Sequence, residues 1–257
     1  MSTLPLFYKN IVPLNKNIHG AWSLEKVSDY KHTSETNSLY VAAIEFMKIA
    51  CEYPIVFCLG SDGAIFPVVI LGLRKDENLY INKAGQWLAN YIPAYIRRYP
   101  FILASDKSIS GEGTDQETPE KFTVCIDSDW KGFNTKEKGE QLFDLGNESE
   151  MLQKSIDFLK EYQLHVEKTQ DFCAKLKELS VLESMQATVK LSNGENISLG
   201  GFLGVNRKKI KDLDKTILSY LVEKDYMELI YAHFTSLNNL ELLGNRCAKQ
   251  GTGGRVQ

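Results

Sequence analysis

Apolar residues between positions 55 and 82 occur in short runs separated by turn residues. Residues 55–59 and 65–73 are nearly all apolar and flank the turn sequence Gly-Ser-Asp-Gly, which predicts two strands buried on both faces. Residues 77–82 alternate apolar and polar positions and are predicted to form a third strand. Short strands so close together in the chain favour a largely antiparallel meander.

Helical periodicity appears on either side of this region. Residues 40–53 predict a helix buried over most of its circumference, because Glu45, Lys48 and Glu52 form its only polar stripe. Residues 148–182 contain neither Gly nor Pro and keep apolar residues at helical spacing, which predicts one long helix or two joined by a bend. The following segment alternates around Asn193-Gly194, a pair typical of a tight β-hairpin turn.

Together these patterns predict an α+β fold: a single compact domain with a largely antiparallel sheet flanked by helices. Two polar segments are expected to be unstructured, a mobile surface loop at 106–121 and a disordered, glycine-rich tail at 247–257. The expected division is a β-rich N-terminal part, 1–146, with helices near 40–53 and 92–99, and a mainly helical C-terminal part, 147–246, with a hairpin at 185–199.

Composition narrows the class of protein. The chain has 257 residues, of which 43% are hydrophobic and 25% charged, a balance typical of a folded protein. Its net charge of −3 supplies no general positive field, so we expect no nucleic-acid partner. No uninterrupted apolar stretch reaches the roughly 18 residues of a membrane span, and the five scattered cysteines fit reduced thiols, so we expect a cytoplasmic protein.

The segment from Trp87 to Phe101 concentrates aromatic and cationic residues. Aromatic residues recur every fourth position, and two arginines stand near the end of the segment; the residues are Trp87, Tyr91, Tyr95, Tyr99, Arg97 and Arg98. In a helix these aromatic side chains form one stripe, which predicts a groove for a peptide or an anionic group. The alternative is a stripe buried in the core, and Pro93 favours a helix that starts only after Tyr91.

Two further residues are candidates for a site. Asp127, with Asp129 near it, follows the predicted strand 122–126, a position where carboxylates can hold a metal or act as bases. The alternatives are a turn cap or an ion pair with Arg97 or Arg98. His233 lies in the segment IYAHFTSL near Thr235 and Ser236, and it is either a binding residue or a hydrogen-bonded core histidine. The four histidines form no metal-binding motif, and no nucleotide or hydrolase motif occurs, so we expect neither a metal nor a cofactor.

Several segments, in this order, resemble the SapC family. The resemblance extends from about Glu45 to Leu243 and rests on EFMKIACEYPIVF, PVVILGL, ENLYIN, GQW, YIPAYIRRYPF, CID, GEQLFD and IYAHFTSLNNLELL. The family is bacterial and is named for a component encoded with surface-layer (S-layer) proteins. It differs from the peptide-transporter permease of similar name, which is a membrane protein.

The resemblance implies an accessory or binding protein rather than a particular reaction. Its client is expected to be a surface-layer protein or another peptide or protein. One departure from the family pattern is the basic start of the helix after Val205, at Arg207, Lys208 and Lys209, where acidic residues are expected. The alternative function is a peptide- or protein-modifying enzyme, an oxidative one included, with a His/Asp/Arg site assembled only in space. Whether the chain is an enzyme is left open by the sequence.

Overall fold

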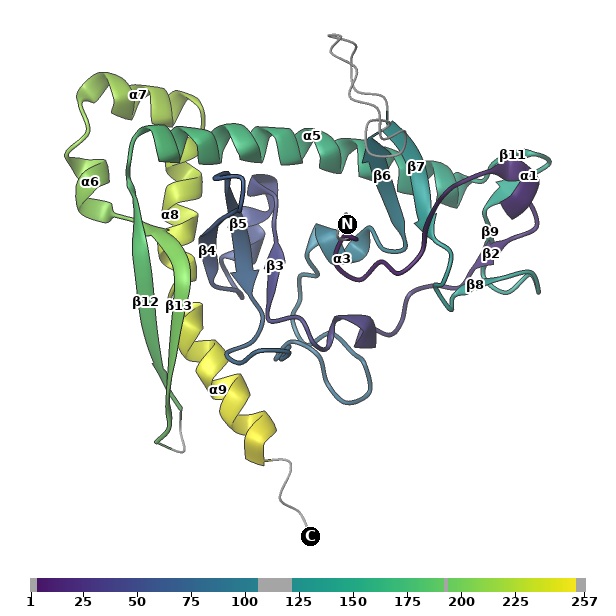
Figure 1. Ribbon diagram of the computed structural model, residues 1–257, viewed down its shortest axis with the longest axis horizontal. Helices are drawn as coiled ribbons and strands as arrows, with labels where there is room; N and C mark the ends of the chain where they lie inside the picture. The colour runs from purple at the N-terminus through teal and green to yellow at the C-terminus, as the bar shows by residue number, and fades with distance from the viewer. Residues whose placement is uncertain (1–3, 106–121, 192–193, 253–257) are drawn as a thin grey trace. The chain divides into compact units, whose positions relative to one another are not determined.

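The computed structural model describes residues 4–105, 122–191 and 194–252 (Figure 1). Helices flank antiparallel sheets, as predicted for an α+β fold. The chain divides into two compact units, each made of two separate stretches of sequence. Unit 1 comprises Met1–Ser28 and Ile96–Leu164, and unit 2 comprises Asp29–Tyr95 and His165–Gln257.

Unit 2 contains a five-stranded antiparallel sheet in the order β12-β13-β4-β5-β3. The predicted hairpin is present as β12 and β13, and the sheet's strands are β3 (Ser38–Tyr40), β4 (Ile55–Leu59), β5 (Ile65–Ile70), β12 (Leu182–Lys190) and β13 (Asn196–Val205). The pairing shifts register between Met185 and Ala187, opposite Gly201, whose positive φ of 87° suits a bulge.

Both stretches of unit 2 contain helices. They are η1 (Lys31–Thr33), η2 (Ala43–Glu45), α2 (Phe46–Ile49), α6 (Arg207–Lys211), α7 (Lys215–Glu223), α8 (Tyr226–Ser236) and α9 (Asn239–Thr252). In Figure 1, α8 and α9 follow one another beside the β12–β13 hairpin. The short α3 (Ala94–Arg97) begins at the end of the first stretch of unit 2 and crosses into unit 1.

Unit 1 has two three-stranded sheets, β1-β7-β6 and β8-β2-β9, and a separate pair, β10-β11. Its elements are β1 (Ile11–Pro13), α1 (Lys16–His19), β2 (Ser23–Leu24), β6 (Phe101–Ser105), β7 (Phe122–Asp127), β8 (Phe133–Asn134), β9 (Glu140–Gln141), β10 (Phe143–Asp144) and β11 (Asn147–Glu148). The predicted long helix is one element, α5 (Glu150–Glu178). The boundary between the units falls within α5, after Leu164.

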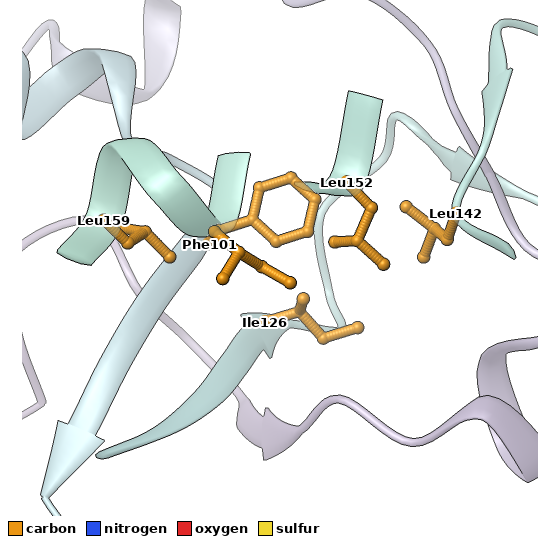
Figure 2. Packing of buried hydrophobic residues seen from close by; sticks show 6 residues of the cluster. Phe101, Ile126, Leu142, Leu152 and Leu159 are labelled. Carbon is orange, nitrogen blue, oxygen red and sulfur yellow. The ribbon is translucent and has the colours of Figure 1, made fainter. Parts of the chain in front are cut away.

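The core of unit 1 forms between α5 and the β6–β7 pair. Figure 2 shows Phe101 and Ile126 from these strands facing Leu152 and Leu159 of α5, with Leu142 beside them. Leu142, Leu152 and Ile126 are fully buried. Because α5 supplies a continuous apolar face to this core, strands β6 and β7, which carry Phe101 and Ile126, are held against its first turns.

The predicted helix at 40–53 is much shorter than expected. Residues 38–40 pair with β5 as β3, and the helical part is limited to η2 and α2. The prediction of a mostly buried circumference is wrong, because Ile44 and Met47 are 62% and 53% exposed. Glu45, placed in the polar stripe by its sequence spacing, is instead 3% exposed. Its carboxylate accepts a hydrogen bond from the backbone N–H of Ala42, which fixes the start of the helix.

The predicted strand at 77–82 is also wrong. The only pairing there is an isolated bridge between Ile81 and Trp87. Asn78 is buried, donates to the carbonyl oxygen of Thr33 and accepts from the backbone N–H of Tyr80. These side-chain hydrogen bonds, with isolated backbone bonds such as that from the Leu79 N–H to the Leu71 carbonyl oxygen, take the place of a regular ladder.

The tail predicted to be disordered from 247 is helical to Thr252, because α9 continues and buries Cys247. The helix predicted near 92–99 is present only as the four residues of α3. The predicted loop at 106–121, residue Asn193 of the hairpin turn and the last five residues of the predicted tail lie outside the described residues.

Candidate functional site

A cleft of about 390 Å³ opens in unit 1 where the end of α3 meets the first turns of α5 and strand β9. Two of the predicted site residues, Arg97 and Arg98, lie in its wall. The full lining is Arg97, Arg98, Phe101, Glu140, Glu150, Met151, Lys154, Ser155 and Phe158. Cationic, aromatic and acidic side chains therefore share one concave surface, which is the candidate site.

The cations of this cleft are held next to aromatic rings. The guanidinium carbon of Arg97 is 5.0 Å from the centre of the Phe158 ring, and Arg97 is exposed to solvent. Arg98 is half-buried and lies 5.7 Å from the ring of Tyr8 and 5.5 Å from that of Tyr162. A guanidinium that lies over a ring directs its N–H groups within its own plane, a geometry in which arginine can bind carboxylates.

The remaining charges leave the cleft mildly positive. Lys154 Nζ is 2.6 Å from Glu150 Oε1, a pair four residues apart on the exposed face of α5. The hydrogen bond from Lys154 lowers the pKa of the Glu150 carboxyl, so this acid is ionised and largely offset by its partner. Glu140 is the other acid of the lining, against two arginines. An anionic group beside an apolar one fits this surface better than a cation does.

Asp127 and Tyr99 form a buried cluster elsewhere in unit 1. Asp127 is fully buried, and its carboxylate accepts hydrogen bonds from the backbone N–H groups of Lys9 (3.1 Å), Asn10 (2.9 Å) and Asp129 (3.3 Å) and from the Tyr99 hydroxyl (3.0 Å). Burial, followed by the neighbouring Asp127, raises the pKa of Tyr99. The carboxylate is thus used to hold the N-terminal segment against β7, which is a structural role.

Trp87 and Tyr91 belong to unit 2 and take part in another buried network. The indole N–H of Trp87 donates to the Tyr53 hydroxyl at 2.8 Å, and that hydroxyl donates to the carbonyl oxygen of Tyr91 at 2.5 Å. The Tyr91 hydroxyl donates to Glu45, which also accepts from the backbone N–H of Ala94. Both residues precede α3, so they are not part of a continuous helical stripe with Tyr99.

His233 is a fully buried residue of α8 in unit 2. Its Nδ1–H donates to the carbonyl oxygen of Ile55 at 2.8 Å, and its Nε2 accepts from the backbone N–H of Val205 at 3.2 Å. Burial lowers the pKa of His233 to about 4, with a further lowering by the charge of Arg207. The imidazole is therefore neutral and joins α8 to β4 and β13.

The predicted site residues are thus distributed over several environments. Trp87, Tyr91, Tyr95 and His233 belong to unit 2, whereas Arg97, Arg98, Tyr99 and Asp127 belong to unit 1. Tyr95 is half-buried within α3. Only the two arginines line the cleft.

Sequence reasoning missed the α5 side of the cleft. Met151, Ser155 and Phe158 are spaced by four and three residues, which places them on one face of a helix. That mixed apolar and polar face was visible in the sequence. The sequence did not show that this face meets Arg97, which stands more than 50 residues earlier in the chain.

The described residues offer neither a metal-binding cluster nor a membrane-spanning helix. Within residues 4–105, 122–191 and 194–252, no three or more His, Cys, Asp and Glu side chains are grouped so as to hold a metal ion. In the same residues, every helix is too short or too polar to cross a membrane. The fold and the cleft define an α+β protein with a concave surface lined by arginine and aromatic side chains.

The family model of SapC matches residues 14–243, which is most of the chain. The chain belongs to the SapC family. No curated protein and no solved structure matches it.

Proposed function

We propose that this chain is a cytoplasmic accessory or binding protein for peptide or protein clients such as surface-layer proteins, and that the cleft of unit 1 receives a short client segment. The observation that carries the proposal is the position of Arg97 and Arg98 in a concave surface with Phe101 and Phe158. A client segment with an acidic side chain next to an aromatic or aliphatic one matches both the arginines and the rings of the cleft.

The cleft favours binding of a small motif over a large interface. Its volume of about 390 Å³ accommodates only one or two side chains. Arg97 reaches the motif from the end of α3, and Phe158 supplies an apolar wall from α5. Because the arginine already lies on the ring, little side-chain entropy is lost when an anion binds.

Replacing Arg97 by glutamate is expected to weaken binding of such a motif about tenfold or more, because an attractive charge becomes a repulsive one. The measurement is fluorescence anisotropy of the full chain with a labelled peptide whose residues are uncharged except for the glutamate of a single Glu-Phe pair. The same peptide with Lys-Phe in place of Glu-Phe serves as the second probe and is expected to bind poorly.

The matched control is Lys160→Glu, the same charge reversal at an exposed position of α5 outside the cleft lining. It is expected to leave the affinity within about twofold of the wild type. Equal weakening by both variants, or equal binding of both peptides, would show that the cleft does not select this motif.

A further inference from the structure

A second charged surface lies in unit 2, on the short helix α6. Figure 1 shows α6 directly after β13, at the opposite end of the hairpin from its turn. Four of its five residues are cationic and exposed, in a chain whose net charge is −3. The fifth, Ile210, is buried and holds the helix against the unit.

Three of the cations point in similar directions. At 3.6 residues per turn, Arg207, Lys208 and Lys211 fall within an arc of about 100° around α6. Lys209 lies outside this arc, and its ammonium donates to the carbonyl oxygen of Ser180. Asn206 caps the helix by accepting from the backbone N–H of Lys209, so the helix is fixed at its start.

The first of these cations is held on aromatic rings of α8. The guanidinium carbon of Arg207 lies 4.1 Å from the centre of the Phe234 ring and 6.0 Å from that of Tyr231. The hydrogen bond from Val205 to His233 fixes this arrangement, because Val205 immediately precedes the helix cap and His233 immediately precedes Phe234. Tyr231 is 52% exposed, so an apolar surface remains open next to the charges.

The charges of α6 have no acidic partner within the described part of the chain. None of its four cations makes an ion pair with a carboxylate there. Asp212, exposed at the end of α6, makes no ion pair with these cations within the described residues, and two further nearby carboxylates are used otherwise. Glu183 accepts from the side chain of Asn206 at 2.6 Å, and Asp214 caps α7 by accepting from two backbone N–H groups.

We propose that Arg207, Lys208 and Lys211, together with Tyr231, form a docking surface for an acidic protein segment with several successive carboxylates. Charge complementarity selects this occupant. Single-stranded nucleic acid fits less well, because Arg207 already covers the ring of Phe234 on which a base would stack, and the chain's overall charge is negative. This surface is separate from the cleft, so the proposal stands or falls independently of the function proposed above.

The test uses the full chain and a labelled oligoglutamate peptide in an anisotropy titration at low salt. The double variant Arg207→Glu/Lys211→Glu is expected to weaken binding at least about tenfold, and added salt is expected to weaken wild-type binding. Lys224→Glu, at an exposed position after α7, is the control and is expected to leave the affinity unchanged. Arg207→Lys is expected to retain most of it, because the charge is kept.

Further measurements decide which surface binds the peptide and which class of ligand the α6 surface prefers. Wild-type affinity of the double variant Arg207→Glu/Lys211→Glu would assign the peptide to another surface and overturn the proposal. An oligoglutamine peptide is expected not to bind. Tighter binding of oligothymidylate, or of phosphatidylglycerol vesicles, would identify a nucleic acid or a lipid surface as the occupant and overturn the acidic-segment proposal. Absence of oligoglutamate binding by the wild type would do so as well.

Discussion

Replacing Asp127 by alanine is expected to lower the free energy of unfolding by roughly 3–5 kcal/mol, enough to unfold much of unit 1 in a protein of ordinary stability. The carboxylate accepts four hydrogen bonds in a fully buried position. Alanine leaves three backbone N–H groups and the Tyr99 hydroxyl without these acceptors. The stranded Tyr99 hydroxyl is buried and costs about 1–3 kcal/mol before relaxation. The three backbone hydrogen bonds are only partly buried, so each of their donors costs less.

Two milder variants separate the parts of this effect, with chemical denaturation as the measurement. Tyr99→Phe removes one hydrogen bond and is expected to cost about 1 kcal/mol. Asp129→Ala, two residues away and exposed, is expected to change stability by less than about 0.5 kcal/mol. An Asp127→Asn protein that unfolds like the wild type but no longer binds peptide would show that the carboxylate serves binding rather than folding.

The second large effect is a loss of stability in mild acid caused by His233. Its pKa is about 4 in the folded protein, below the ordinary value of 6.5 that applies in the unfolded chain, so between these values the unfolded chain binds a proton that the native protein does not. Stability is fully present above pH 6.5 and falls as the pH drops toward 4. The total loss from this residue is about 3 kcal/mol, since each pKa unit is worth about 1.4 kcal/mol.

Urea unfolding at several pH values between 7 and 4 measures this loss. His233→Gln is expected to be less stable at pH 7 by about 2 kcal/mol, because its hydrogen bonds to the backbone of Ile55 and Val205 would be poorly aligned. Its stability is also expected to depend less on pH, because glutamine does not titrate. Burial also lowers the pKa of His32 to about 4, so His32→Gln is needed to separate its contribution. An imidazole of His233 that titrates near pH 6.5 in the native protein would contradict this account.

Elements whose pattern is local could be predicted from the sequence. The helix α5 lacks breakers over its whole length, and the β12–β13 hairpin combines alternation with a turn pair, so neither depends on distant partners. The segment around Glu45 shows the opposite case. Its carboxylate is buried because it accepts from Tyr91 and Ala94, more than 40 residues later, and no spacing rule contains that information.

The candidate site was predictable to a similar extent. The sequence singled out Arg97 and Arg98 because they stand at the end of a run of regularly spaced aromatic residues, and both lie in the cleft. It also singled out His233, whose environment depends on tertiary contacts. His233 and Ser236 lie one helical turn apart on α8, and both hydrogen-bond to the backbone of Ile55. In the sequence such a pair resembles part of a binding site, whereas in the fold its hydrogen bonds join α8 to β4.

The division of each unit into two stretches has a consequence for synthesis. Residues 29–95 leave the ribosome well before residues 165–257, with which they form unit 2, whereas unit 1 is complete once residue 164 has emerged. At ordinary translation rates the early half of unit 2 waits several seconds for its complement, with the apolar strands β4 and β5 already exposed. Cutting the gene near codon 146 would leave both units unfinished, so co-expressed halves must reassemble before either can fold.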